Sequence, residues 1–293
     1  MQLLRRRTSI PVPHVFEFSK IRRNPLGYPH IWLSFIAGIP LYNFWHAETP
    51  EEDRRRHRTH VLKAVASAMV QLSKFSYQMG GRLLFDTSGP YTGAKHFYTT
   101  ALDSYKPDPG FLHGQKRLLK FFIGCMDEFF AADRQSFKFL VDEHGNLAGI
   151  IDWDGVGAWL KSLGNLSYPD WLTRDWDPED TPQTLVRYRR IYQAAIRDAL
   201  VENKVDKGHH TFYTSATLIT ENLRIAPTSP MGSGNILRKI VNEIAKVDRV
   251  PCTYGDEFLY MELCETFGKG KPSDGVQVAL RAGFTELLQS TTL

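Results

Sequence analysis

The residues with the clearest chemical potential lie in one stretch, residues 131–155, which reads "AADRQSFKFLVDEHGNLAGIIDWDG". Two apolar segments flank a turn at residues 144–146, and this pattern predicts a β-hairpin. Two acids, Asp152 and Asp154, stand at the end of its second strand. Since Mg²⁺ prefers carboxylate oxygens as ligands, the pattern is that of a metal-binding hairpin. The alternative is a pair of acids at an exposed hairpin end.

The segment before the hairpin supplies one more acid, Asp133, and a lysine, Lys138, at a place where a metal ligand could stand. Asp133 is a candidate catalytic base, or an ordinary acid between a helix and a strand. The Lys138 ammonium has three donors and no lone pair, so it cannot ligate Mg²⁺ while protonated. Its simpler reading is a strand residue that points outward between Phe137 and Phe139.

The elements that would position these residues are mixed. Residues 8–46 read as β structure, with strands in "IPVPHVFEF" and "HIWLSFI" around the turn "RRNPLGYP". A helix should follow, with Thr49 as N-cap, Pro50 at its first position and Glu52 closing a capping box. Its buried face would be formed by apolar residues at helical spacing, namely Val61, Val65, Ala68, Leu72 and Phe75.

The rest of the chain is predicted to be mainly helical. Residues 111–130 form one helix before the hairpin, and residues 181–203 form another that repeats the Thr-Pro start. The glycines of "MGSGNILRK" should precede a helix that starts near Ser233, and "FGKGKP" should end one. The sequence therefore predicts a small β portion, residues 1–46, and a large helical portion, residues 47–293, that contains the hairpin at 133–154.

Composition limits the function classes. The net charge of +4 is too small to indicate a nucleic-acid partner. The three cysteines are odd in number and widely spaced, which favours neither a disulfide framework nor a zinc site and indicates a reducing, cytoplasmic location. The apolar stretch "HIWLSFIAGIPLYNFW" is interrupted by Gly38 and Pro40 and is shorter than the roughly 20 residues that span a bilayer, so no membrane partner is expected.

Three stretches resemble the aminoglycoside phosphotransferase family, in particular its fungal-type branch. They are "RTSIPVPHVFEFSKIRRNPLGYPHIWLSFIAGIPLYNFW", "FLVDEHGNLAGIIDWDGVGAW" and "SLGNLSYPDWLTRDWDP". The resemblance implies an α+β, protein-kinase-like fold with a reduced β N-lobe and hinge, and a helical C-lobe. It also implies phosphoryl transfer from ATP, with Mg²⁺, to a small-molecule hydroxyl. The substrate is left open.

The family's H-x-D-x-x-x-x-N loop falls on Ala131, Asp133 and Lys138 of this chain. The resemblance thus implies Asp133 as catalytic base and Asp152, with Asp154 nearby, as metal ligands. Ala131 replaces the histidine that braces the loop, and Lys138 replaces the metal-binding asparagine. We therefore predict that Lys138 pairs with Asp152 and takes over the electrostatic role of the metal.

The resemblance also indicates which part of a nucleotide site remains. Backbone groups near Ser34 and Ile36 would contact an adenine ring, and Leu140 and Ile151 would supply apolar walls. Only seven residues precede Thr8, which leaves no room for the family's phosphate loop and strand lysine. Three functions stay open: an unusual small-molecule kinase with weak activity, a non-catalytic pseudokinase-type binding module, and a fragment of a longer active kinase.

Overall fold

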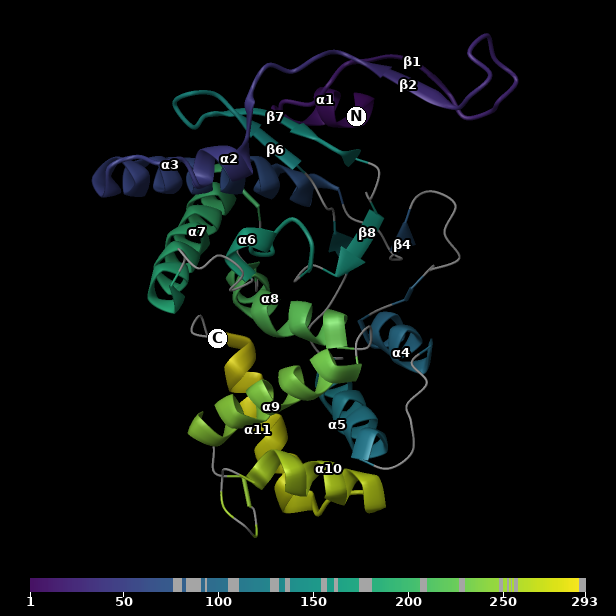
Figure 1. The fold of residues 1–293 in the computed structure, drawn as a ribbon, viewed down its shortest axis with the longest axis vertical. Helices are drawn as coiled ribbons and strands as arrows, with labels where there is room; N and C mark the ends of the chain where they lie inside the picture. Colours follow the sequence, from purple (N-terminus) through teal and green to yellow (C-terminus); the bar gives the residue numbers. More distant parts are fainter. Residues whose placement is uncertain are drawn as a thin grey trace. The chain divides into compact units, whose positions relative to one another are not determined.

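The computed structural model describes most of the chain and shows a mixed α+β fold that is mainly helical (Figure 1). The described residues are 1–75, 81–82, 91–92, 94–104, 111–126, 132–134, 138–153, 157–160, 163–173, 181–205, 210–226, 230–247, 250–251, 253, 255 and 258–289. None of the helices in these ranges is long and apolar enough to cross a membrane.

The chain forms two compact units, and each combines segments that are distant in sequence. Unit 1 comprises residues 1–75, 135–156 and 190–207, and unit 2 comprises residues 76–134, 157–189 and 208–293. Helix α7 (Pro182–Glu202) contributes its first part to unit 2 and the remainder to unit 1. Each unit is made of several separate segments, so neither unit tests the boundary between the two lobes that was predicted at residue 46. That boundary stays a prediction.

Unit 1 contains the predicted β segments and the predicted hairpin. Its elements are α1 (Gln2–Arg7), β1 (Val15–Ser19), β2 (His30–Leu33), β3 (Ile39–Pro40), α2 (Leu41–Trp45), α3 (Glu51–Gln71), a 3₁₀ turn (Leu72–Lys74), β6 (Lys138–Val141) and β7 (Leu147–Ile151). Strands β1 and β2 pair antiparallel as a two-stranded ribbon, and β3, β6 and β7 form a separate antiparallel sheet in that order. The short helix α2 was not predicted.

The predicted capping box at the start of α3 is wrong. The helix begins at Glu51, Pro50 is its N-cap with ψ 145°, and within the described residues no side chain caps the first turn. Glu52 instead binds the Arg55 guanidinium one turn later. The Thr49 carbonyl accepts a hydrogen bond of 3.1 Å from the Arg54 guanidinium. A local ion pair therefore takes the carboxylate that the capping box required.

The buried face of α3 agrees with the predicted spacing. Val61, Val65 and Ala68 of α3 are buried, as is Leu72 in the 3₁₀ turn that follows the helix. The fifth predicted residue, Phe75, lies beyond that turn and is only half-buried. Sequence analysis missed Arg58, which is buried as well: its Nε donates to the Trp45 carbonyl at 3.0 Å, and its guanidinium lies 4.8 Å from the centre of the Trp45 ring. This arginine joins α3 to α2 through a charge-assisted hydrogen bond and a cation–π contact.

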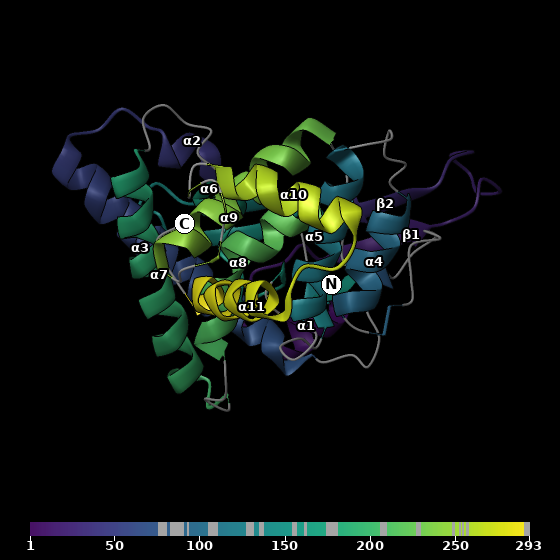
Figure 2. The same cartoon turned by 90° about the horizontal axis from the view of Figure 1, so that it is seen from below.

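Unit 2 is a helical bundle with a short sheet. Its elements are β4 (Gly81–Arg82), α4 (Ala94–Ser104), α5 (Phe111–Cys125), β5 (Ala132–Arg134), β8 (Gly157–Leu160), α6 (Asp170–Thr173), α8 (His210–Ile225), α9 (Pro230–Val247), α10 (Leu259–Lys269) and α11 (Asp274–Gln289). The sheet has the order β4-β8-β5. Figures 1 and 2 both show α5, α8, α9, α10 and α11 side by side.

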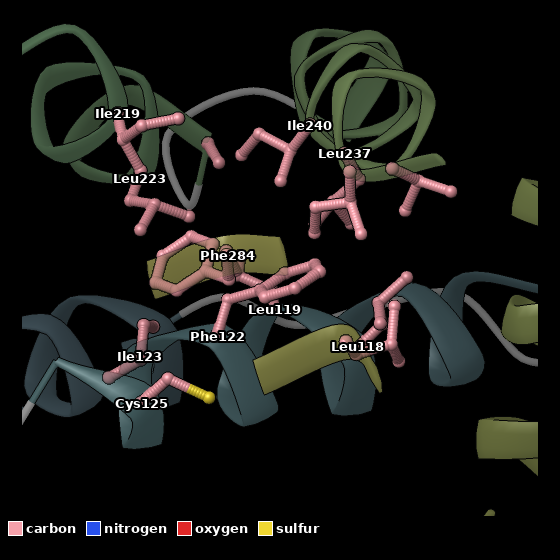
Figure 3. Packing of buried hydrophobic residues seen from close by; sticks show 14 of the residues in the cluster. Leu118, Leu119, Phe122, Ile123, Cys125, Ile219, Leu223, Leu237, Ile240 and Phe284 are labelled. Atoms are coloured by element: carbon pink, nitrogen blue, oxygen red, sulfur yellow. The ribbon is translucent and has the colours of Figure 1, made fainter. Parts of the chain in front are cut away.

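The core of unit 2 lies between these helices. Figure 3 shows Leu118 and Phe122 of α5 facing Leu223 of α8 and Leu237 of α9, with Phe284 of α11 between them. The Phe122 and Phe284 rings stack with centroids 4.9 Å apart. Buried apolar side chains of this kind are the main stabilising contribution to a domain.

Some helix boundaries in unit 2 agree with the boundaries predicted from the sequence, and others do not. Thr181 caps α7 as predicted, because its hydroxyl accepts the Thr184 N–H at 3.2 Å. Helix α10 ends at Lys269 with Gly270 as its C-cap, also as predicted. The prediction that a helix starts near Ser233, with glycines before it, is wrong, because α9 already begins at Pro230. A Cβ on Gly234 would lie 3.2 Å from the Gln115 side chain, so this glycine allows α5 to approach α9 closely.

The closest backbone approach in the bundle gives a test of the fold. A Cβ placed on Gly114 of α5 would lie 1.8 Å from the Cys264 carbonyl oxygen of α10. Because that atom belongs to a helix backbone, it cannot move aside, and we expect Gly114→Ala to lower the free energy of unfolding by about 3 kcal/mol. Urea denaturation of the purified chain measures this change.

Gly124, near the end of the same helix, is the matched control. A Cβ built there meets no described atom within 4 Å. Gly124→Ala should leave stability unchanged or raise it by up to about 1 kcal/mol, because alanine is the better helix former. Equal effects of the two substitutions would contradict the packing of α5 on α10.

Candidate functional site

The candidate site is built on the β6–β7 hairpin of unit 1, and its turn is held by Asp142. The carboxylate accepts hydrogen bonds from the backbone N–H groups of His144 and Asn146, at 2.9 and 2.8 Å, and from the Asn146 amide at 2.8 Å. Gly145 completes the turn with φ +83°, a conformation that favours glycine. The predicted turn at residues 144–146 is therefore confirmed.

The turn also packs against two helices. The His60 ring of α3 lies 2.8 Å from the Asn146 side-chain oxygen. A Cβ on Gly145 would lie 3.0 Å from the Phe44 ring and 3.2 Å from a Val61 methyl group. These contacts fix the turn of the hairpin against α2 and α3. The register of β6 and β7 is therefore set from the end of the hairpin that contains the turn.

The register divides the hairpin into two faces. Phe139 pairs with Ile150, and Lys138 pairs with Ile151, while Leu140 pairs with Gly149. Opposite residues of an antiparallel pair project to the same side, and successive residues alternate. Ile150 lies on the buried face and is fully inaccessible. Lys138, Leu140 and Ile151 share the other face, where all three are at least partly exposed.

Ile36 covers the middle of this second face. A Cβ on Gly149 would lie only 2.7 Å from the Ile36 Cδ1 atom, so the isoleucine occupies the space that a side chain at position 149 would need. The structure thus brings together three of the four residues that the resemblance assigned to nucleotide binding, Ile36, Leu140 and Ile151. We name this group the apolar face.

Ser34, the fourth of these residues, is already engaged. Its backbone N–H donates to the His14 carbonyl at 2.8 Å, and its hydroxyl accepts the His14 N–H at 2.8 Å. These bonds connect the ends of β1 and β2. The backbone donor that Ser34 was expected to offer to an adenine ring is therefore used within the protein.

Asp152 follows β7 directly and carries the central charge of the site. Its φ is +63°, in the left-handed region that residues with a Cβ adopt at a cost of about 1–2 kcal/mol. The Lys138 Nζ lies 2.9 Å from an Asp152 carboxylate oxygen, and the two side chains are 74% and 43% exposed. The predicted pairing of Lys138 with Asp152 is confirmed. Lys138 is also outward-facing, as its simpler reading required.

This pair decides how well Mg²⁺ would fit at Asp152. An ammonium at hydrogen-bond distance occupies the carboxylate and supplies no lone pair. A cation that replaced it would meet like-charge repulsion from Lys138. Among the described residues, no group of three or more His, Cys, Asp or Glu side chains could hold a metal ion. The described part of this site therefore does not fit Mg²⁺ as it stands.

Of the two remaining predicted site residues, Asp133 and Asp154, the structure describes only Asp133. Asp133 lies in β5, a strand of unit 2 in which Ala132 pairs with Leu160 and Arg134 with Gly157 of β8. It belongs to a different unit from the Lys138–Asp152 pair, and its role as a base stays a prediction. Asp154, the second expected metal ligand, lies outside the described residues.

Sequence reasoning missed the residues that hold the hairpin in place. Asp142 was read only as part of the strand–turn pattern, although Asp-x-x-Gly-Asn is a recognisable turn signal. The indole N–H of Trp153 donates to the Ile150 carbonyl at 2.8 Å, next to Asp152. The contact of His60 with Asn146 spans 86 residues and has no local signal.

No family model, curated protein or solved structure matches the chain at a significant level.

The turn gives a prediction about ionisation. The Asn146 side chain, with help from two backbone N–H groups, holds the pKa of Asp142 below that of an ordinary aspartate. A carboxyl NMR titration should find this lowered pKa. Asn146→Ala should raise it, because the hydrogen bond from the Asn146 amide is the largest cause.

The same shift links the turn to pH. Since the pKa of Asp142 is lower in the folded state, its contribution to stability is fully present above the unfolded pKa and is lost as the pH falls through the folded pKa. Asp142→Ala should remove this dependence while leaving the remaining pH profile in place. A pKa that does not respond to Asn146→Ala would contradict the turn geometry.

Proposed function

We propose that this protein is a kinase-like, non-catalytic binding module of the pseudokinase type, in which Lys138 takes the place of the metal ion at Asp152. In this proposal the fold is related to that of the aminoglycoside phosphotransferases, and phosphoryl transfer has been lost or is weak. The observation that supports it best is the 2.9 Å contact between the Lys138 Nζ and the Asp152 carboxylate.

Compensation of the negative charge of Asp152 explains the Lys138–Asp152 ion pair better than a contribution to the stability of the fold does. Both side chains are more than a third exposed, and exposed ion pairs contribute only about 0–1 kcal/mol. Asp152 nevertheless keeps its left-handed backbone, which costs more than that. A residue held in such a conformation at the end of a strand fits a site whose carboxylate has to be presented in one direction.

The proposed ligand surface is the apolar face beside the pair. Ile36, Leu140 and Ile151 are each half-buried, so they offer apolar area without belonging fully to the core. A planar ring could lie on such a surface, because apolar contact does not require the missing phosphate-binding residues. The Lys138–Asp152 pair at its edge could orient a polar substituent. We therefore expect ligand binding at the apolar face to be independent of Mg²⁺.

A weakly active small-molecule kinase is the second candidate. The strained backbone of Asp152 favours it, because strain at a single acid is typical of functional sites. In that case Asp133 would act as base, and Asp152 with Asp154 would hold the metal once Lys138 moved away. The two candidates differ in whether nucleotide binding requires Mg²⁺.

A thermal-shift titration of the purified chain with ATP distinguishes them. We expect no stabilisation that depends on Mg²⁺, because the ammonium occupies the carboxylate that the metal would need. A shift with ATP alone would support binding at the apolar face, and Leu140→Asp should abolish that shift. Stabilisation that appears only with Mg²⁺ would overturn the non-catalytic proposal and favour the weak kinase.

The role of Lys138 can be tested by restoring an amide. Lys138→Asn removes the positive charge and supplies the side-chain oxygen that the resemblance places there. Mg²⁺ affinity, measured by isothermal titration calorimetry, should rise by about tenfold or more, since a unit charge near a divalent ion opposes binding even in water.

Two further variants separate charge from ligation. Lys138→Ala should give a smaller gain, because it removes the repulsion but adds no oxygen. In Lys138→Asn/Asp152→Asn the gain should vanish if Asp152 is the site of binding. Stability should change by no more than about 1 kcal/mol in Lys138→Asn, as expected for an exposed pair. Unchanged Mg²⁺ binding in Lys138→Asn would refute the substitution of metal by lysine.

A further inference from the structure

The β1–β2 ribbon of unit 1 exposes an unusual amount of apolar surface. Phe18 lies opposite Ile31 in the register, and Leu33 follows two residues later on the same face. Their exposed fractions are 68%, 48% and 40%. Figure 1 shows the ribbon and its connecting loop extending away from β6 and β7.

Such a surface indicates a binding role. A two-stranded ribbon with one apolar face is only marginally stable in water unless that face is covered. Contiguous apolar patches on a protein surface typically mark interaction sites. The apolar area is not confined to the strands, because the loop at residues 20–29 is also rich in exposed apolar side chains.

This loop has a defined structure. The Asn24 amide donates to the carbonyls of Ile21 and Tyr28, at 2.6 and 2.8 Å, and its side-chain oxygen accepts the Leu26 N–H at 2.8 Å. The loop therefore has three internal bonds to one side chain. It presents Ile21, Leu26 and Tyr28 outward, with 55%, 52% and 70% of each residue exposed.

The charge of the loop is positive. Lys20, Arg22 and Arg23 flank Ile21 in the first part of the loop and are exposed. The first 40 residues contain six Lys and Arg and a single acid, Glu17, whose carboxylate lies 3.7 Å from the His30 ring. Three of those arginines, Arg5, Arg6 and Arg7, form the last turn of α1 in the same unit. The partner that complements the charge of the loop is an anionic one.

We propose that the loop at residues 20–29, which we name the basic loop, binds an anionic lipid surface. Ile21, Leu26 and Tyr28 would enter the interface while Lys20, Arg22 and Arg23 contact the acidic headgroups. Ile21 and Leu26 are aliphatic and offer no ring on which a base could stack, so they favour lipid over single-stranded nucleic acid. Tyr28 and the exposed Trp32 of β2 are aromatic residues of the kind that is enriched at membrane interfaces. The three like charges disfavour pairing with a second copy.

This inference is independent of the proposed function, because it concerns a different surface of unit 1. It also departs from the expectation of no membrane partner. That expectation concerned segments long enough to span a bilayer, whereas the basic loop would bind from one side only.

Vesicle co-sedimentation of the purified full chain tests the proposal. The probes are phosphatidylcholine vesicles with and without about 30% phosphatidylserine, at low and high salt. We expect binding only to the anionic vesicles, weakened by salt. Lys20→Gln/Arg22→Gln/Arg23→Gln should lower the affinity by about a hundredfold, since each basic residue near the surface contributes severalfold.

A second variant tests the apolar contribution. Ile21→Ser/Leu26→Ser/Tyr28→Ser keeps every charge, and it should also reduce binding because less apolar area enters the interface. All six side chains are exposed, so both variants should melt at the wild-type temperature. The matched control, Arg55→Gln/Arg56→Gln/Lys63→Gln, removes the same number of charges from the exposed side of α3 and should bind like the wild type.

Several outcomes would overturn the proposal. One is the absence of binding to anionic vesicles, and another is equal binding by the loop variants and the wild type. Loop-dependent binding of a single-stranded oligonucleotide without vesicle binding would assign the surface to nucleic acid. A loop-dependent dimer in light scattering, without vesicle binding, would assign it to a second copy.

Discussion

The turn of the β6–β7 hairpin is the constraint on which the candidate site depends. One carboxylate, Asp142, collects three hydrogen bonds and so fixes the turn, while Gly145 leaves the room in which the turn meets α2 and α3. A shift of one residue in the register would move every side chain of the strands to the opposite face. The neighbourhood of Lys138 and Asp152 thus follows from contacts made at the far end of the hairpin.

Local signals predicted the parts of this arrangement that need no distant partner. Two apolar segments around the turn were enough to predict the hairpin. The pairing of Lys138 with Asp152 was predicted from the resemblance, which places Lys138 where a metal-binding asparagine would stand, together with the lack of a lone pair on its ammonium. The Thr-Pro pair shows where such signals fail. At Thr181 it starts a helix with a hydroxyl cap, whereas at Thr49 the following Glu52 binds Arg55 and the cap does not form. The same dipeptide gives two results because α7 begins at its proline, which puts Thr181 at the N-cap, whereas α3 begins one residue after its proline, so that Pro50 is the N-cap.

Several features that sequence reasoning missed depend on residues distant in the chain. No local pattern singles out Arg58, yet it is buried against Trp45. Gly234 was read as preceding a helix, but it lies inside α9 where α5 comes close. The kinase-like resemblance has the same limitation, since motif positions alone do not establish that Asp133 and Asp152 act on one substrate. No pattern of spacing within one segment contains that information.

The contact between Ile36 and Gly149 has a consequence for access to the strands. A ligand that reached the backbone of β7 at Gly149 would have to rotate the isoleucine away, and it would then lie in the space that the isoleucine vacated. Ile36 would therefore limit access to Gly149 by steric hindrance. A ligand would have to be narrow enough to fit beside the isoleucine, or to make contacts that offset the free-energy cost of displacing it. Shortening this one side chain would widen the range of shapes that the surface accepts, whereas a side chain at position 149 would close it.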